Sequence, residues 1–178
     1  GYLPENNPTD APDGYDEQSA HILTRTVGTG HLAGYCRMIF DQPRPLPITC
    51  LYPHLAAALD TPVEISRFSV RHLWRGRFHS AGLAPIFQLS QGLLLLTRQY
   101  DLKAWSCLID HRFQQLCERF FKVDFEILGE PALYMGSPCV PCVVKLSESI
   151  RNNIRNPRFE DVWSEHGLDD WARDFDVK

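Results

Sequence analysis

A carboxylate, a hydroxyl and a guanidinium occur within four residues of one another, at Glu64, Ser66 and Arg67. They interrupt a run from Val63 to Val70 whose β-branched and aromatic residues are typical of a strand. A carboxylate can accept a proton from a reacting group, and a guanidinium can hold an anionic group through two parallel hydrogen bonds. Burying either charge costs free energy unless it has a partner. The strand is therefore a candidate site for proton transfer and anion binding.

The alternation of a strand limits how these groups can cooperate. Side chains three positions apart, such as Glu64 and Arg67, point to opposite faces of a regular strand. Only a β-bulge between them would bring both to one cleft. The alternative is that each charge forms a buried or edge ion pair with a neighbouring element and has no part in chemistry. These residues alone leave both interpretations open.

The apolar pattern predicts the elements that position these groups. Residues 1–18 are rich in Pro, Asn and Asp without a periodic apolar face, so we expect an irregular lead-in. We then expect a strand over 20–27, a turn and a strand over 32–40, followed by an irregular stretch over 42–47 and a short helix over 51–59. The central strand over 63–70 is followed by a buried helix over 82–98, a strand over 104–109 and an amphipathic helix over 111–121. Strands over 123–127 and 140–146 and a polar helical tail over 148–178 complete the chain. Within the second long helix, the residues at helical spacing that we expect in the core are Phe113, Leu116, Cys117, Phe120 and Phe121. The pattern predicts a single α/β domain spanning 1–178.

Composition narrows the class of protein. A chain of 178 residues with a formal net charge of -4 lacks the basic footprint of general nucleic-acid binding. No apolar run approaches the roughly 20 residues of a membrane helix, and no signal peptide is visible. The six cysteines lie mostly in apolar segments of a mid-sized chain, which indicates reduced thiols and a cytoplasmic location.

Two further charged segments precede the strand. The first is Asp13-Gly14-Tyr15-Asp16, followed by Ala20-His21-Ile22-Leu23, and the second is Gly34-Tyr35-Cys36-Arg37-Met38-Ile39. Together with Glu64-Ile65-Ser66-Arg67-Phe68-Ser69-Val70, they resemble in order and spacing the motifs of the acyl-homoserine-lactone (autoinducer) synthases and N-acyl amino acid synthases. Ser19, His21, the proline-rich stretch after Arg37 and residues 128–140 resemble the acyltransferases of exosortase/PEP-CTERM systems more than the autoinducer synthases. The resemblance implies the GNAT acyltransferase fold, with a mixed, mostly antiparallel central sheet flanked by helices.

The resemblance also implies an activity. Such enzymes move a fatty acyl group from the phosphopantetheine thioester of acyl carrier protein or coenzyme A to an amino group, with no bound cofactor and no metal. By this resemblance the catalytic residues are Glu64, as general base, with Ser66 and Arg67, and the substrate-binding residues are Arg37, Asp13, Asp16 and Phe68. The implied partners are acyl carrier protein and a small amine or amino acid acceptor, with no nucleic acid and no integral membrane segment.

Other interpretations remain open. The nearest is an acyl-homoserine-lactone synthase, which uses S-adenosylmethionine as acceptor, and a more distant one is a non-catalytic acyl- or carrier-binding module. Asp13 and Asp16 could be loop caps. Cys139-Val140-Pro141-Cys142 is a single Cys-x-x-Cys pair, whereas a four-ligand zinc site normally needs two more ligands at matching spacing.

A basic cluster follows the central strand. GNAT enzymes usually bind phosphates with a glycine-rich loop here, but between residues 71 and 82 this chain has only Gly76 before Gly82. The cluster consists of Arg71, Arg75 and Arg77. These side chains can meet a phosphopantetheine phosphate or an acidic carrier surface, or they can be ordinary solvated charges.

The family carries a helical N-terminal segment, with aromatic and basic residues, that covers the acceptor site. By resemblance, Gly1-Tyr2-Leu3-Pro4 corresponds to the end of that segment. We therefore expect either that this segment is missing from the sequence as given or that the protein lacks this cover.

Overall fold

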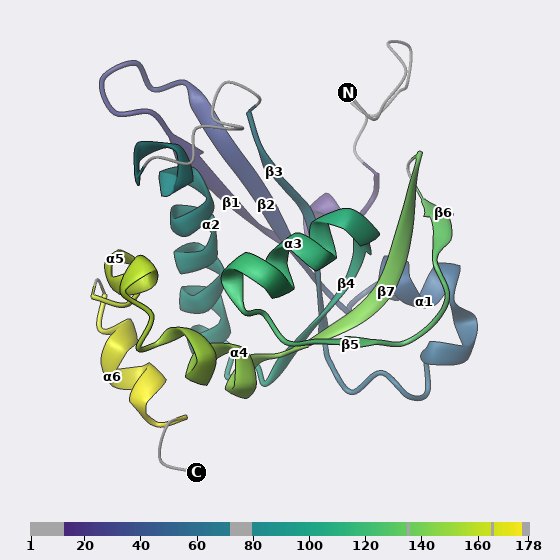
Figure 1. Cartoon of the computed structure of the whole chain (residues 1–178). Helices are drawn as coiled ribbons and strands as arrows, with labels where there is room; N and C mark the ends of the chain where they lie inside the picture. Colours follow the sequence, from purple (N-terminus) through teal and green to yellow (C-terminus); the bar gives the residue numbers. More distant parts are fainter. Residues whose placement is uncertain (1–12, 72–79, 135, 165, 176–178) are drawn as a thin grey trace.

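A seven-stranded mixed sheet with helices packed on both faces forms the computed structural model of the chain (Figure 1). The structure describes residues 13–71, 80–134, 136–164 and 166–175. Its strands are β1 (Ser19–Arg25), β2 (Leu32–Phe40), β3 (Val63–Val70), β4 (Ala104–Asp110), β5 (Phe125–Ile127), β6 (Ala132–Tyr134) and β7 (Ser137–Lys145). Its α-helices are α1 (Pro47–Leu51), α2 (Ser80–Gln99), α3 (His111–Phe121), α4 (Leu146–Asn153), α5 (Glu160–Trp163) and α6 (Leu168–Arg173). Short 3-10 turns are η1 (Asp16–Gln18), η2 (Pro53–Leu55) and η4 (Pro157–Phe159).

The strand order confirms the predicted sheet. The strands lie in the order β1-β2-β3-β4-β7-β5, and β6 also pairs with β7. Among the described strand pairs, only β3 with β4 is parallel. The fold is therefore the mixed, mostly antiparallel α/β arrangement that the sequence predicts.

The parallel pairing of β3 with β4 is short. Glu64 is in register with Ser106 and Ile65 with Cys107, and the pairing extends no further within the described residues. The β4 side of β3 from Ser66 onward therefore has no described strand beside it. On that side, the backbone N–H and C=O groups of β3 beyond Ile65 are not part of a described strand ladder.

Most predicted elements are present, and the elements predicted over 32–40, 63–70 and 111–121 agree at both ends. The helix predicted over 51–59 is wrong, because α1 ends at Leu51 and only η2 follows it. Pro47 occupies a first-turn position that proline favours, and Pro53 has no N–H with which to continue the helix. β6 was not predicted, because a strand of three residues is too short to show a periodic apolar pattern.

The apolar side chains of α3 do not all enter the core. Phe120 is 44% exposed, so its predicted burial is wrong. The guanidinium of Arg119 lies 5.4 Å from the centre of the Phe120 ring, which keeps this ring at the surface as a cation–π partner. Phe113, Cys117 and Phe121 are half-buried and line a cavity, so the sheet-facing side of α3 is as predicted.

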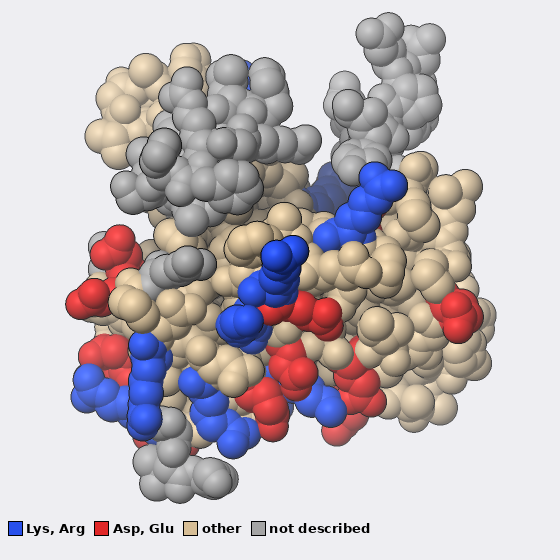
Figure 2. Space-filling view, in the orientation of Figure 1, with Lys and Arg blue, Asp and Glu red and all other residues tan. Residues whose placement is uncertain are grey.

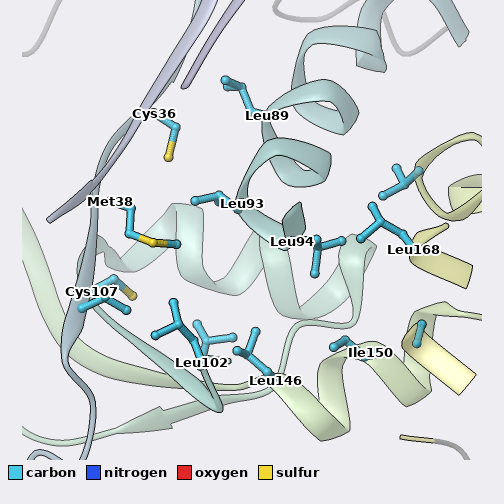
Figure 3. Packing of buried hydrophobic residues seen from close by; sticks show 14 of the residues in the cluster. Cys36, Met38, Leu89, Leu93, Leu94, Leu102, Cys107, Leu146, Ile150 and Leu168 are labelled. Carbon is cyan, nitrogen blue, oxygen red and sulfur yellow. The ribbon is translucent and has the colours of Figure 1, made fainter. Parts of the chain in front are cut away.

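Two apolar clusters lie on opposite faces of the sheet. In the larger one, Leu89 and Leu93 of α2 lie towards Cys36 and Met38 of β2, while Leu94 lies towards Leu168 (Figure 3). The smaller cluster joins α1 to the other face of β2 and consists of Ile39, Leu46, Ile48 and Leu55. Adjacent residues of a strand point to opposite faces, so Met38 and Ile39 belong to different clusters. The smaller cluster fixes the start of α1 against the sheet.

The surface carries charges of both signs. Figure 2 shows acidic and basic side chains interspersed on the face that it presents. Ion pairs between residues three or four positions apart occur on α4 and α6, where Arg151 pairs with Glu148 and Arg173 with Asp169. Among the helices of the described ranges, none has the length and apolarity needed to cross a membrane.

Candidate active site

A β-bulge lies in the middle of β3. Tyr35 and Arg37 of β2 are paired with Ser69 and Ser66, so three steps along β3 oppose two steps along β2. Arg67 has φ 55°, in the left-handed region that a non-glycine residue adopts at a cost. The extra residue breaks the alternation of the strand. This is the bulge that the sequence analysis requires if Arg67 is to share a cleft with Glu64.

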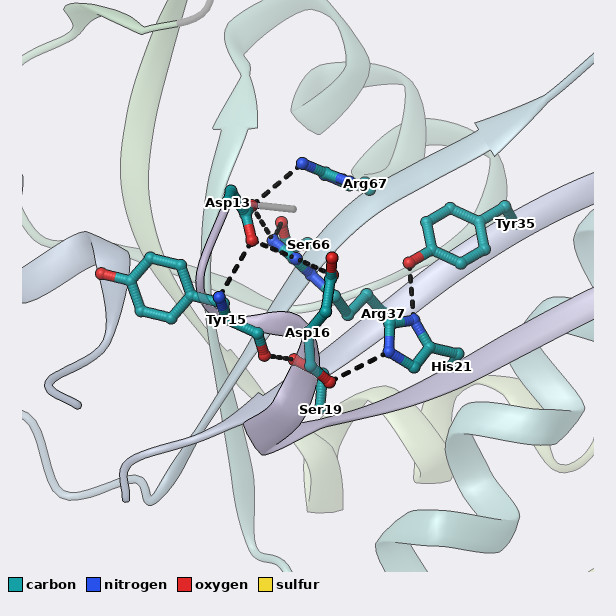
Figure 4. Close-up of polar contacts among 9 residues, drawn as sticks. All are labelled: Asp13, Tyr15, Asp16, Ser19, His21, Tyr35, Arg37, Ser66 and Arg67. Carbon is teal, nitrogen blue, oxygen red and sulfur yellow. Dashed lines mark hydrogen bonds and ion pairs between the residues drawn. The ribbon is translucent and has the colours of Figure 1, made fainter. Parts of the chain in front are cut away.

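Arg37 forms the centre of a charged cluster on this face of the sheet (Figure 4). Its Nη1 and Nη2 donate to Oδ1 and Oδ2 of Asp13, each at 2.8 Å, and Nη1 also donates to Oδ1 of Asp16 at 2.8 Å. The side chain of Arg37 is only 2% exposed. Nη2 also donates a long 3.5 Å hydrogen bond to Oγ of Ser66. The cluster therefore fastens the segment before β1 onto β2 and β3.

Asp13 is shared between two arginines. Nη2 of Arg67 donates to Oδ2 of Asp13 at 2.9 Å, and the N–H of Tyr15 donates to Oδ1 at 3.1 Å. The hydrogen bonds from Arg37 are the main reason why the pKa of Asp13 is lowered to about 2. Both oxygens of Asp13 thus accept two hydrogen bonds each, which leaves this carboxylate little capacity to bind a substrate. Arg67, in contrast, uses only Nη2 towards the described residues.

Glu64 lies on the same face and is almost completely buried. It is 2% exposed, and its Oε2 accepts a hydrogen bond of 2.7 Å from the N–H of Ile48 in the first turn of α1. Burial raises the pKa of Glu64 to about 7, although the hydrogen bond from Ile48 and the charge of Arg37 act in the opposite direction. Within the described part of the chain, Oε1 accepts no hydrogen bond. A carboxylate with this pKa can take up a proton near neutral pH.

The buried carboxylate has a testable effect on stability. Because the pKa of Glu64 rises from 4.5 to about 7 on folding, the folded state holds this proton more tightly. Its contribution to stability is present below pH 4.5 and is lost as the pH rises through about 7. We expect the free energy of unfolding of wild type, relative to Glu64→Gln, to fall by about 3 kcal/mol between pH 4 and pH 8. Urea titrations of both proteins measure this, and a difference independent of pH would contradict it.

An apolar cavity of about 220 Å³ lies on the opposite face of β3. Ile65 and Phe68 of β3 form part of its wall, together with Phe113, Cys117 and Phe121 of α3. The rings of Phe68 and Phe113 are 6.0 Å apart at their centres. The cavity and the charged cluster thus lie on opposite faces of β3. Phe68, which the resemblance implies to be a substrate-binding residue, lies in the wall of this cavity.

The basic cluster predicted after β3 is only partly described. Arg71 lies just beyond β3 and is exposed, and its N–H donates to the carbonyl of Ala33 at 3.0 Å. Arg75 and Arg77 lie outside the described residues. The position of Arg71 places at least one cation at the end of β3 where β3 and β4 have separated.

The cysteine pair does not form a binding site in the described structure. Cys139 is paired with Asp110 and Cys142 with Cys107 in the ladder of β7 with β4. Residues three positions apart in a strand face opposite ways, so the two thiols are directed to different sides of the sheet. Among the described residues, no group of three or more His, Cys, Asp or Glu side chains could hold a metal ion.

Three features of the site lie outside the sequence predictions. They are the N–H of Ile48 on Glu64, the cavity wall contributed by α3, and the pair formed by His21 and Tyr35. The pair of His21 and Tyr35 could have been found from the sequence pattern. Tyr35 is two residues before Arg37 and therefore on the same face of β2, and a hairpin of this length brings a residue of the preceding strand opposite Arg37.

Comparison with known proteins bears on the fold of the chain. The sequence matches no protein-family model and no curated protein. Among solved structures, the CoA-dependent acyl-homoserine lactone synthase BjaI, in complex with SAM and isopentyl-CoA, has a TM-score of 0.60 and 18% identity, covering 86% of this chain and 67% of that chain. FeeM, an N-acyl amino acid synthase from uncultured soil microbes, has a TM-score of 0.59 and 16% identity, covering 83% of this chain and 77% of that chain. The AHL synthase LasI has a TM-score of 0.59 and 19% identity, covering 76% of this chain and 68% of that chain. The chain therefore has the α/β fold of these synthases, as the resemblance of its motifs implies.

Proposed function

We propose that the protein is an N-acyltransferase that moves a fatty acyl group from a phosphopantetheine thioester to the amino group of an amino acid or a related amine, giving an N-acyl amino acid. One observation carries this proposal. The bulged strand β3 has a buried carboxylate of pKa about 7 on one face and an apolar cavity against its other face. A base and an acyl-sized apolar site on either side of one strand suit amide formation from a thioester.

The donor would occupy the cavity side. The acyl chain would lie among Ile65, Phe68 and the apolar face of α3, and the thioester would lie where β3 leaves β4. Backbone N–H groups beside the bulge would polarise the thioester carbonyl. Arg71, with Arg75 and Arg77, would meet the phosphate or the acidic carrier. Both acyl carrier protein and coenzyme A present this phosphopantetheine arm, and we favour the carrier protein in the cytoplasm as donor.

Chemistry would begin when the acceptor amine loses a proton to Glu64, directly or through a water. The amine nitrogen then attacks the thioester carbonyl carbon, the carbon–sulfur bond breaks, and the thiolate leaves and takes up one proton. The products are an amide and the free thiol of the carrier. A pKa of about 7 suits Glu64 to this role, because near neutral pH its carboxylate is partly ionised and can take up the proton that the amino group must lose before it attacks.

The acceptor would lie on the charged face. Arg67 has spare N–H groups, so it is the better candidate for binding an acceptor carboxylate. Arg37 already donates to Asp13 and Asp16. We therefore assign Arg37, Asp13 and Asp16 to holding the site together, with the second oxygen of Asp16 the most available of their groups, and Ser66 to supporting Arg37.

An assay with purified protein tests the proposal against its rivals. Decanoyl-CoA and decanoyl-acyl carrier protein would each be offered with the proteinogenic amino acids and with S-adenosylmethionine, and thiol release and product mass would be measured. We expect an N-decanoyl amino acid. Acyl-homoserine lactone as product would instead favour the autoinducer synthase. Thioester binding without thiol release, unaffected by Glu64→Gln, would indicate a non-catalytic module.

The cavity predicts selectivity for the acyl chain. Cys117 lines the cavity midway along α3, between Phe113 and Phe121. We expect Cys117→Phe to lower kcat/KM for a decanoyl donor about tenfold or more, because the larger side chain occupies space that the chain needs. The rate with an acetyl donor serves as the internal control and should change little. Equal losses with both donors would contradict a role of this cavity in acyl binding.

A further inference from the structure

His21 and Tyr35 form a hydrogen-bonded pair next to the charged cluster. Nδ1 of His21 lies 2.8 Å from Oη of Tyr35, and Nε2 of His21 lies 3.2 Å from the backbone carbonyl oxygen of Asp16 (Figure 4). His21 is opposite Arg37 in the pairing of β1 with β2, and Tyr35 is two residues before Arg37. All three side chains therefore lie on the face of the sheet that holds the candidate acceptor site.

The partners of His21 fix the direction of these hydrogen bonds. The carbonyl of Asp16 can only accept, so Nε2 of a neutral His21 must carry the proton. Nδ1 then has a lone pair and accepts the hydroxyl proton of Tyr35. Burial raises the pKa of Tyr35 above 10.0, which keeps the phenol protonated and able to donate. With its only proton directed at His21, Oη of Tyr35 presents lone pairs alone to its other neighbours.

The other groups of the site offer the opposite chemistry. Among the charged side chains around Arg37, Asp13 already accepts four hydrogen bonds, whereas Arg67 has N–H groups to spare. Tyr35 is close enough to both arginines and to Asp16 for their charges to act on its hydroxyl. Tyr35 also pairs with Ser69, directly beyond the bulge of β3. An acceptor-only oxygen thus lies on the same face as Arg67, whose guanidinium uses only Nη2 towards the described residues, and next to the bulge of β3.

We propose that Tyr35, with its hydroxyl oriented by His21, accepts a hydrogen bond from the amino group of the acceptor, while Arg67 holds the acceptor's carboxylate. This inference rests on the proposed function and names the ligand class of the acceptor subsite, an α-amino acid with both groups free. Tyr35 is a positioning residue in this scheme, since Glu64 takes the proton. His21 acts through Tyr35 by holding the hydroxyl proton away from the incoming amine.

Kinetics of acyl transfer test this pair. With decanoyl thioester saturating and the best amino acid from the panel as acceptor, we expect Tyr35→Phe to raise the acceptor KM about tenfold, the worth of one hydrogen bond, and to change kcat less than about twofold. His21→Leu should have a similar effect, whereas His21→Gln should restore most of the affinity, because an amide can still donate to Asp16 and accept from Tyr35. Tyr52→Phe is the matched control, since it also removes a hydrogen-bonded phenol, one that donates to the backbone carbonyl of Glu130, and should leave KM unchanged.

A second readout follows the imidazole itself. Nitrogen-15 NMR of His21 should show a neutral ring protonated at Nε2, with an Nδ1 resonance that moves in Tyr35→Phe and stays in place in Tyr52→Phe. Protonation at Nδ1, or an unchanged acceptor KM in Tyr35→Phe, would overturn this inference while the proposed function stands. Absence of transfer to every amino acid by the wild type would overturn both.

Discussion

Glu64→Gln should lower kcat/KM for acyl transfer by about 10²–10⁴-fold, the usual contribution of a positioned general base. The amide cannot take up the proton that the amine must lose. Its carbonyl can still accept the hydrogen bond from the N–H of Ile48 at the start of α1, so the fold around the site should persist. Stopped assays of thiol release and amide formation measure the loss.

The pH dependence separates this effect from a structural one. The pKa of Glu64 is about 7, so the wild-type rate relative to Glu64→Gln should rise as the pH increases through 7, as the carboxylate loses its proton. Taking the ratio removes the titration of the amine. Glu126→Gln, at an exposed carboxylate of β5 paired with Lys145, is the control and should retain full activity. A rate ratio that stays flat from pH 5 to pH 9 would exclude Glu64 as the base.

Arg37→Met should cause the largest loss of stability. Removing one partner of a buried ion pair typically costs about 3–5 kcal/mol. We expect the lower end, about 3 kcal/mol, because Asp13 and Asp16 are 31% and 35% exposed and keep some hydration. Methionine nearly preserves the apolar volume, so the change isolates the guanidinium. Thermal and urea unfolding should both report the loss.

The control for this prediction is a matched surface cluster. Arg173 also pairs with two carboxylates, those of Asp169 and Asp170, but it is 67% exposed. Arg173→Met should change the free energy of unfolding by less than about 1 kcal/mol.

Acid should remove the stabilisation that Arg37 gives through Asp13, because the pKa of Asp13 is lowered from 3.8 to about 2 on folding. Its stabilisation is present above pH 3.8 and is lost as the pH falls through 2. Equal losses in Arg37→Met and Arg173→Met would contradict a central role for Arg37.

The sequence predicts the frame of this site well because its strands follow simple periodicity. The β2 and β3 boundaries agree with the structure, and the charged residues of three separated segments meet around Arg37. The resemblance of these segments to known motifs carried more of this prediction than local pattern did. Local pattern alone could not distinguish a catalytic carboxylate from a paired one.

What the sequence could not predict depends on tertiary contacts. The bulge at Arg67 arises from the register of β3 against β2, and nothing in the local residue types requires it. The sequence implied that Arg37 binds the substrate, but it could not show that both terminal nitrogens of Arg37 donate to Asp13 and Asp16. The raised pKa of Glu64 likewise depends on how α1 covers it.

The amphipathic helix α3 shows the same limit. Helical spacing correctly predicts that one side of this helix faces inward, yet it cannot distinguish a filled core from a cavity wall. Phe113 and Phe121 line the cavity, while Phe120 lies at the surface. An unfilled apolar space is a property of all the elements around it, so it appears only in the folded structure.

The most direct test of the central claim is mass spectrometry of lipid extracts from bacteria that express the protein, beside bacteria that express Glu64→Gln to the same level. If Glu64 is the base of an N-acyltransferase, the wild-type extract should contain N-acyl amino acids that are absent from the variant extract. Their masses would identify the acyl chain and the acceptor. The same N-acyl amino acids at equal abundance in both extracts, or acyl-homoserine lactones in their place, would contradict it.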